Sequence, residues 1–235
     1  MKSKIIKINN LLIGRFGFPS RSKVKPTPIN TLIATILSQN TNDKNSYIAY
    51  KNLKANFKSW NELSSATVTE IEKLIRVGGL AKQKARAIKD LINKLKNQNK
   101  TIDLKHISKL NNRDAIIELT SFNGVGVKTA SCVLLFSMNR NVCPVDTHVH
   151  RTLNRIGLVK TKSADKTFWL LNQNFPDGIA HVFHTNLIKL GRDICKSTNP
   201  LCESCPLFKI CSFPQKNLKP AKKSNQTDFL LLDNI

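Results

Sequence analysis

Apolar residues recur along most of this chain at the spacing of an α-helix, and this pattern limits the possible folds more than any other feature. A clear example starts at Pro28, where the residues at helical spacing are Ile29, Leu32, Ile33, Ile36 and Leu37. Thr27 precedes them as an N-cap, and Thr67 with Glu70 forms a capping box ahead of a second helix. No stretch alternates with a period of two in β-branched residues. The sequence therefore predicts an all-α fold.

Further helices are predicted at 81–96, 113–120, 128–138, 146–156, 163–174 and 178–190. The N-terminal run is basic and then apolar, so a signal peptide is one interpretation. Polar residues interrupt this run and no small-residue cleavage site follows, which favours an amphipathic helix. We therefore expect an intracellular protein of the cytoplasm or nucleoid, and the basic composition leaves a nuclear or mitochondrial address open.

The charge balance predicts a polyanionic partner. The 235 residues include 38 Lys and Arg against 15 Asp and Glu, a formal net charge of +23. Each Lys or Arg that meets a phosphate releases a counterion, so nucleic acid is the favoured partner. A ribosomal or RNA-binding protein would share this charge, and an anionic membrane surface fits less well. Because no apolar run approaches the ~20 residues of a membrane span, we expect no membrane partner.

Four of the six cysteines form one group near the C-terminus, Cys195-x6-Cys202-x2-Cys205-x5-Cys211. Four thiolates within 17 residues can surround one metal centre. Two disulfides would not suit an intracellular chain. Zinc is the main alternative, but zinc sites usually pair two short knuckles, and only one is present here. The spacing therefore favours an iron–sulfur cluster over zinc.

A Gly-x-Gly motif, Gly124-Val125-Gly126, lies between two predicted helices. Glycine lets the chain turn tightly and lets its backbone approach a ligand closely. The free N–H groups of the following helix can then bind a phosphate oxygen, which would hold DNA without regard to its sequence. An ordinary corner between two helices is an equal interpretation of this motif alone.

Lys128 and Asp146 are the candidate catalytic pair. Lys128 falls in the first turn of the helix after the Gly-x-Gly motif. The helix dipole there disfavours a cation, which suits an amine that acts as a nucleophile. Asp146 follows 18 residues later and is also well placed to be a helix N-cap. The two roles of Asp146 are compatible.

Five motifs together resemble endonuclease III of the helix-hairpin-helix glycosylase superfamily. They are Ile36-Leu-Ser-Gln-Asn-Thr-Asn-Asp43, Gly79-Leu80 with Lys84-Ala85, Gly124-Val-Gly-Val-Lys-Thr-Ala130, Val145-Asp-Thr-His-Val149 with Arg151, and Gly191-Arg192 ahead of the cysteines. Their order and spacing hold over residues 25–212. The resemblance implies that Cys195, Cys202, Cys205 and Cys211 hold a 4Fe–4S cluster. Two departures are Asn123, where the family commonly has proline, and Val127, where a basic residue is common.

The resemblance also implies the architecture. We expect a helix-hairpin-helix glycosylase fold, with a helical barrel domain at residues 27–140 and a discontinuous iron–sulfur domain at 1–26 and 141–212. The DNA cleft would lie between them. Residues 213–235 are polar and Lys-rich, which predicts a flexible tail. Its apolar end, Phe229 to Leu232, is interpreted as loosely docked rather than as a partner-binding peptide. We expect a monomer.

The reaction implied is removal of oxidised pyrimidines from double-stranded DNA, and cutting of abasic sites, after the damaged nucleotide has left the stack. Lys128 would attack C1′ and form a Schiff base, while Asp146 would stabilise the oxocarbenium charge. β-Elimination would then cut the strand. The residues expected to contact DNA are Gln39, Asn40, Leu80, Gly124, Val125, Gly126 and His148. Core packing is an equal interpretation of Leu80, and a structural histidine is an equal interpretation of His148.

Two other functions remain as alternatives. A monofunctional glycosylase, specific for mismatches or for adenine, would lack Schiff-base chemistry. A non-catalytic iron–sulfur protein that binds DNA would have no use for either Lys128 or Asp146. The presence of both residues favours the bifunctional glycosylase with lyase activity.

Overall fold

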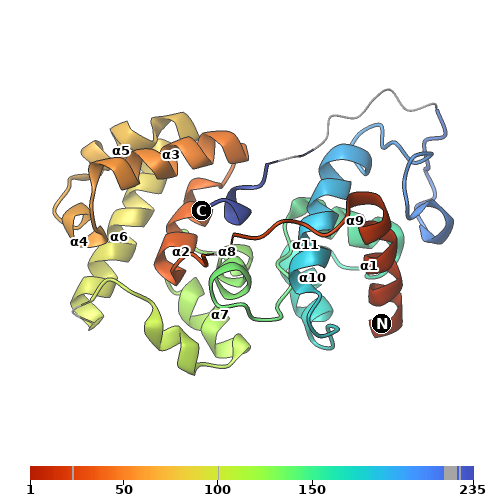
Figure 1. The fold of residues 1–235 in the computed structure, drawn as a ribbon, viewed down its shortest axis with the longest axis horizontal. Coiled ribbons are helices and arrows are strands. Elements are labelled where there is room, and N and C mark those ends of the chain that lie inside the picture. The colour runs from red at the N-terminus through yellow and green to blue at the C-terminus, as the bar shows by residue number, and fades with distance from the viewer. Residues whose placement is uncertain (23, 100, 220–226, 228) are drawn as a thin grey trace. The chain divides into compact units, whose positions relative to one another are not determined.

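The structure, a computed structural model, describes residues 1–22, 24–99, 101–219, 227 and 229–235. In these residues every regular element is a helix or a helical turn and none is a strand, so the all-α prediction is confirmed (Figure 1). No helix among them is long and apolar enough to cross a membrane. The chain divides into two compact units: unit 1 contains residues 1–20 and 141–228, and unit 2 contains residues 21–140 and 229–235.

Unit 2 is built around α2 (Pro28–Leu37). Its remaining helices are α3 (Asp43–Asn56), α4 (Trp60–Leu63), α5 (Val68–Ile75), α6 (Ala81–Asn99), α7 (Asn112–Thr120) and α8 (Val127–Cys132). Short turns η1 (Arg76–Gly78) and η2 (Lys105–Lys109) and a π-turn, η3 (Val133–Ser137), connect or extend them. Eight of the ten residues of α2 are buried, because α3, α6, α8 and η3 all pack against it. A helix covered on all sides needs an apolar surface all round, which α2 has.

Unit 1 is organised around α11 (Ala180–Lys189), which packs against α1 (Lys2–Phe16), α9 (Thr147–Ile156) and the π-turn η4 (Leu190–Ile194). Helix α10 (Ala164–Asn172) packs against α9, and the turn η5 (Phe208–Ile210) belongs to the cysteine-rich segment. The N-terminal run forms the amphipathic helix predicted for it, with Ile5, Ile8 and Leu12 buried.

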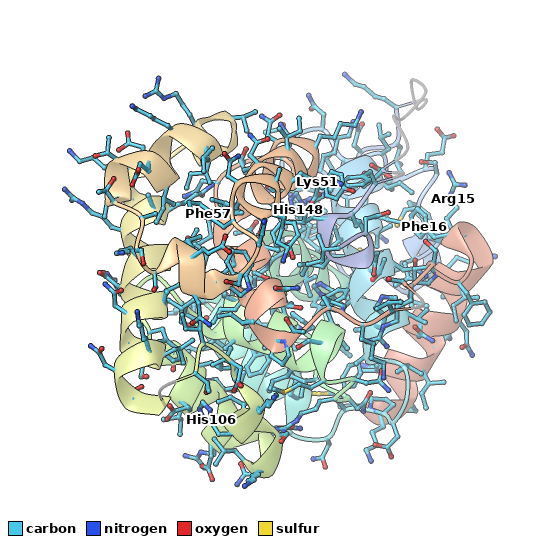
Figure 2. The ribbon with its side chains drawn as sticks, turned by 60° about the vertical axis from the view of Figure 1, so that its left-hand side comes forward. Arg15, Phe16, Lys51, Phe57, His106 and His148 are labelled. Atoms are coloured by element: carbon cyan, nitrogen blue, oxygen red, sulfur yellow. The ribbon has the colours of Figure 1, made fainter. Side chains whose placement is uncertain are left out.

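The predicted caps begin their helices as expected. The side chain of Thr27 accepts a hydrogen bond from the amide of Asn30, and Thr67 with Glu70 forms the complete capping box of α5. The predictions missed α3, which is too polar to show an apolar stripe. Its buried face consists of Ser46, Ala49, Tyr50 and Leu53. Lys51 on this helix and Phe57 at its C-cap are labelled in Figure 2.

The π-turn η3 directly follows the helix that carries Lys128, and an arginine holds it. The Nη2 group of Arg21 donates to the carbonyl of Leu135 over 2.7 Å, and Nη1 donates to Asn139 over 2.5 Å. A π-turn leaves carbonyls without their usual helical partner, so outside donors are needed at this point. Arg21 therefore fixes the C-terminal end of the α8–η3 segment.

The C-terminal residues 229–235 pack on unit 2 through the turn η6 (Leu231–Asp233), which contacts α2 and α3. Leu231 is buried, and its amide donates to Asp43 over 3.3 Å. The ring of Phe229 meets that of Tyr47 edge to face, with 5.5 Å between centroids. The tail predicted to be flexible is residues 213–235, of which residues 220–226 and 228 lie outside the described residues.

We expect Leu231→Ala to release this C-terminal segment from unit 2. Loss of a buried leucine side chain typically costs about 2–5 kcal/mol, which is a large fraction of what so short a segment gains by docking. Native-state hydrogen exchange should show faster exchange at the amide of Leu231, while the α2 amides stay protected. Leu218→Ala is the matched control, because Leu218 is 64% exposed. Unchanged exchange at residue 231 would contradict the packing described here.

Candidate active site

The Gly-x-Gly motif forms a tight hairpin between α7 and α8 in unit 2. Gly124 has a φ of 76°, and a Cβ placed there would lie 3.2 Å from the Cβ of Ala87. Both the left-handed backbone and the close approach to α6 therefore favour glycine. Phe122 and Val125 anchor the hairpin in the core, and the amide of Val125 donates to the carbonyl of Phe122 over 3.1 Å. Gly126 is the N-cap of α8 and provides no side-chain cap.

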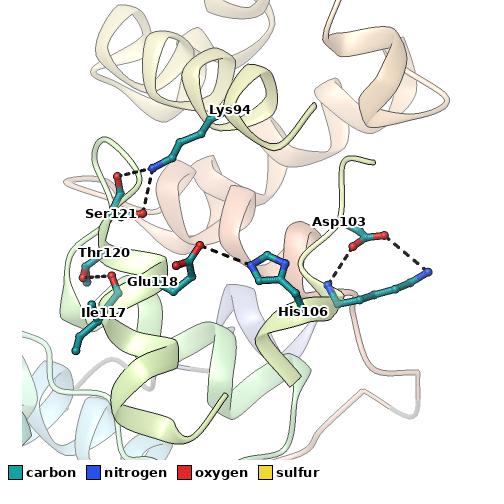
Figure 3. A network of polar contacts seen from close by, with 8 residues as sticks. Lys94, Asp103, His106, Ile117, Glu118, Thr120 and Ser121 are labelled. Atoms are coloured by element: carbon teal, nitrogen blue, oxygen red, sulfur yellow. Dashed lines mark hydrogen bonds and ion pairs between the residues drawn. The ribbon is translucent and has the colours of Figure 1, made fainter. Parts of the chain in front are cut away.

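Contacts to α6 hold the hairpin where the family commonly uses proline. Asn123 donates through Nδ2 to Asp90 over 3.2 Å. The Lys94 ammonium donates to both the carbonyl and the hydroxyl of Ser121 (Figure 3). It also lies 4.8 Å from the ring centroid of Phe122. These contacts tie the hairpin to α6.

A glutamine connects the hairpin to the loop that follows α2. The Nε2 group of Gln39 donates to the carbonyl of Gly124 over 2.9 Å. Asn40, the next residue, is exposed and has a φ of 51°. Leu80 has a φ of 48° and is 49% exposed. That exposure excludes core packing, so the side chain of Leu80 lies at the surface.

Lys128 is the second residue of α8, and its side chain is half-buried. The rest of α8 is fixed in the core of unit 2, because the four residues after Lys128 are all buried. Within the described part of unit 2, the Lys128 ammonium has no hydrogen-bond or ion-pair partner. Unit 2 therefore presents a primary amine at the start of a helix, directly after the hairpin.

Asp146 belongs to unit 1 and caps α9, as the sequence predicts. Its Oδ1 atom accepts a hydrogen bond from the amide of Val149 over 2.8 Å, and the side chain is half-buried. The cap fixes the carboxylate at the start of a helix, where the dipole stabilises its negative charge. Asp146 is therefore held in position by the start of its own helix.

His148, labelled in Figure 2, is held in a cluster of unit 1. Burial lowers the pKa of His148, an effect that the negative charge of Asp146 opposes. Its Nδ1 atom lies 3.3 Å from Nη2 of Arg151, a group that can only donate. The imidazole therefore fits the neutral form with Nδ1 as acceptor. The same Arg151 Nη2 donates to the carbonyl of Gly191 over 2.8 Å.

Gly191 is needed for the close packing of η4 on α9. A Cβ at this position would lie 2.8 Å from the Cβ of His148. We expect Gly191→Ala to lower the free energy of unfolding by about 1–3 kcal/mol, because overpacking forces the backbone to shift. Denaturant unfolding measures this. The control is Gly14→Ala in α1, where no atom lies within 4 Å of the added Cβ, and it should be neutral or stabilising by up to about 1 kcal/mol. Equal effects of the two changes would contradict the contact.

The four grouped cysteines line one cavity in unit 1. Cys195, Cys202, Cys205 and Cys211 share it with Arg155, Phe208 and Lys216, among others. All four thiols are free. Burial raises the pKa of Cys205 to about 12. Among the described residues, no three His, Cys, Asp or Glu side chains are arranged to hold a single metal ion.

Two arginines of α9 organise the start of the cysteine segment. Arg151 donates to the carbonyl of Cys195 from both Nε and Nη2. Arg155 donates to the carbonyls of Lys196 and Ser197 and lies 3.6 Å from the Cys195 Sγ atom. Both arginines therefore bind backbone carbonyls of the cysteine segment. In composition, four thiols that line one cavity are the ligand type and number that an iron–sulfur cluster uses.

Comparison with known proteins identifies the family. Residues 33–177 match the model of the HhH-GPD superfamily base excision DNA repair proteins. The chain belongs to this superfamily. The match includes the hairpin, Lys128 and Asp146, and it extends through parts of both units.

Relatives within the HhH-GPD superfamily narrow the assignment. Endonuclease III of Thermotoga maritima is 35% identical over 86% of this chain and 90% of its own length. A DNA glycosylase-like protein of Arabidopsis thaliana is 37% identical over 85% of this chain, which spans only 63% of that protein. A solved structure of a trapped endonuclease III–DNA covalent intermediate is 28% identical, covers 90% of this chain and 96% of that chain, and has a TM-score of 0.75. The chain is an endonuclease III homologue with the HhH-GPD fold.

Proposed function

We propose that this protein is a base excision DNA glycosylase with abasic-site lyase activity. The observation that carries the proposal is Lys128, a half-buried amine without a partner in unit 2, directly after the Gly-x-Gly hairpin. Membership of a base excision repair superfamily supports the glycosylase activity. The covalent endonuclease III–DNA intermediate solved for a relative supports covalent chemistry in this family.

In the proposed reaction, the neutral Nζ atom of Lys128 attacks C1′ of the deoxyribose and the bond from C1′ to the damaged base breaks. Asp146 remains ionised and stabilises the positive charge that develops on the sugar. The sugar ring opens and leaves a Schiff base between Nζ and C1′. Water takes the C2′ proton, the bond from C3′ to oxygen breaks, and the phosphate leaves with the 3′ part of the strand. A second water then hydrolyses the imine and frees the amine of Lys128.

The remaining site residues would bind double-stranded DNA that carries oxidised pyrimidines or abasic sites. Gln39, Asn40 and Leu80 would fill the gap left when the nucleotide is extruded. The backbone of Gly124, Val125 and Gly126 would bind a phosphate. We propose that His148 orients the DNA or backbone near Asp146. The protein would act as a monomer inside the cell.

We propose that Cys195, Cys202, Cys205 and Cys211 hold a 4Fe–4S cluster. The convergence of the four thiols on one cavity supports this. When bound, such a cluster supplies a rigid crosslink for the cysteine segment and a surface that can face DNA. It is not needed for the proton and carbon chemistry at Lys128. Arg151 and Arg155 hold the segment through its carbonyls.

Borohydride trapping of the wild-type protein tests the proposed function. A duplex with thymine glycol should give a covalent protein–DNA adduct in the presence of borohydride, since reduction fixes the Schiff base. Base release without an adduct would favour the monofunctional glycosylase. Binding to abasic DNA with neither base release nor strand cutting would favour the non-catalytic DNA-binding protein.

A further inference from the structure

Lys84 is buried inside unit 2, although most lysines of this basic chain are exposed. Only 2% of the residue is accessible to solvent. Its Nζ atom donates to the carbonyl of Leu37 over 2.7 Å and to that of Gly78 over 2.8 Å. Burial lowers the pKa of Lys84 to about 8. A methionine would fill similar space without this desolvation, so the ammonium does more than fill volume.

The two acceptor carbonyls lie at equivalent places in two different loops. Leu37 ends α2 and comes two residues before Gln39. Gly78 ends η1 and comes two residues before Leu80. A single ammonium therefore connects the starts of both loops that carry candidate gap-filling side chains. Carbonyls at the end of a helical segment are also where a positive charge is stabilised.

The backbone beyond each carbonyl enters the left-handed region, which is unfavourable for a residue other than glycine. Asn40, Gly79 and Leu80 have φ angles of 51°, 66° and 48°. The amide of Lys84 itself donates to the carbonyl of Leu80 over 3.0 Å. Lys84 thus holds the Gly78–Leu80 turn from both sides, through its side chain and through its own backbone. Strained turns of this kind persist only when the surrounding contacts determine them.

We propose that Lys84 is a positioning residue, which sets the spacing between the Gln39 loop and the Leu80 loop so that both can enter the DNA stack. The inference rests on the proposed function, because it assumes that these loops fill the gap. Lys84 itself would not touch DNA. Its removal would leave two buried carbonyls unsatisfied and let the loops move apart.

The test compares Lys84→Met with Lys82→Met, since Lys82 is exposed on the same helix and controls for the loss of charge. One readout measures unstacking of the duplex without any reaction. It is the fluorescence of 2-aminopurine placed beside a tetrahydrofuran abasic analogue in a duplex. The other is the single-turnover rate of strand cutting at an abasic site, in duplex and in single-stranded DNA. Single-stranded DNA has no stacked gap to fill.

We expect Lys84→Met to lose most of the fluorescence rise and to cut the duplex about 10- to 100-fold more slowly, as a misplacement of about 1 Å can do. Its cutting of single-stranded DNA should change less than about threefold, and Lys82→Met should behave like wild type in both assays. Equal losses on duplex and single strand, or a wild-type fluorescence response, would overturn the inference. If the wild-type protein unstacked the duplex but never cut it, the proposed lyase activity would be refuted and the inference on Lys84 would not.

A second comparison covers the case in which Lys84→Met does not fold. Lys84→Arg keeps the charge and the donors but changes their reach, so the fold should persist and a smaller duplex defect is expected. That defect should nearly vanish in a Leu80→Ala background, because residues that act through one another are not additive. Additive losses in the double variant would overturn the inference.

Discussion

Lys128→Ala is expected to abolish the borohydride-trapped adduct and to slow strand cutting at abasic sites by at least about 10³-fold, as removal of a nucleophile usually does. No other side chain is expected to replace the amine at this point of the hairpin. Binding should survive, because the hairpin backbone and Gln39 are unchanged. Gel-shift titration on a tetrahydrofuran duplex measures that binding separately from the chemistry.

The control for Lys128→Ala is Lys109→Ala, an equal loss of charge at an exposed position of the same unit. It should keep the adduct and the cutting rate. An adduct that persists in Lys128→Ala would mean that another amine, such as a different lysine or the N-terminus, forms the Schiff base. Loss of binding together with activity would instead mean that the substitution disrupts the hairpin.

Asp146→Asn is expected to slow release of the damaged base by about 10²- to 10⁴-fold. The substitution removes the negative charge that stabilises the oxocarbenium-like sugar. It keeps the helix cap, because asparagine accepts the amide of Val149 as well as aspartate does. The free energy of unfolding should therefore stay near that of wild type, while single-turnover base release falls.

Asp146→Ala is the matched variant that separates the two roles of this residue. It loses both charge and cap, so it should show the same catalytic loss and an additional destabilisation of about 1 kcal/mol. If Asp146→Asn released base at the wild-type rate, Asp146 would be a helix cap and nothing more. Cutting of a preformed abasic site needs no base release, so it should suffer less than base release in both variants.

The helices with a marked apolar stripe could be predicted from the sequence, and those packed by small or polar groups could not. The α2 helix carried an apolar run, a proline at its first position and a threonine cap, and it begins at Pro28 as predicted. The α3 helix buries Ser46 and Ala49, residues that look solvent-exposed in a sequence window. Hydrophobic periodicity measures only the apolar part of burial.

The site residues also divide into those with a recognisable sequence signal and those without one. Lys128 and Asp146 are predicted to be the catalytic pair because their spacing belongs to a recognisable pair of motifs, and this assignment stays a prediction. The sequence gives no sign that Lys84 is buried, since nothing local distinguishes it from the exposed Lys82 two residues earlier. Its burial depends on Leu37, a residue 47 positions away in sequence. Leu80 was ambiguous for the opposite reason, because an exposed leucine and a core leucine have the same sequence signal.

Unit 1 is made of two separate stretches of the chain, residues 1–20 and 141–228, and this sets the order in which the two units can fold during synthesis. Unit 2 has nearly all of its residues between 21 and 140, so it can fold while the ribosome is still adding the rest. Helix α1 is made first, yet its partner α11 starts only at Ala180. The apolar face of α1 therefore stays exposed to solvent through most of translation; it consists of Ile5, Ile8 and Leu12. The nascent chain thus exposes the apolar face of α1 after unit 2 has folded. We therefore expect chaperones to be needed most at α1.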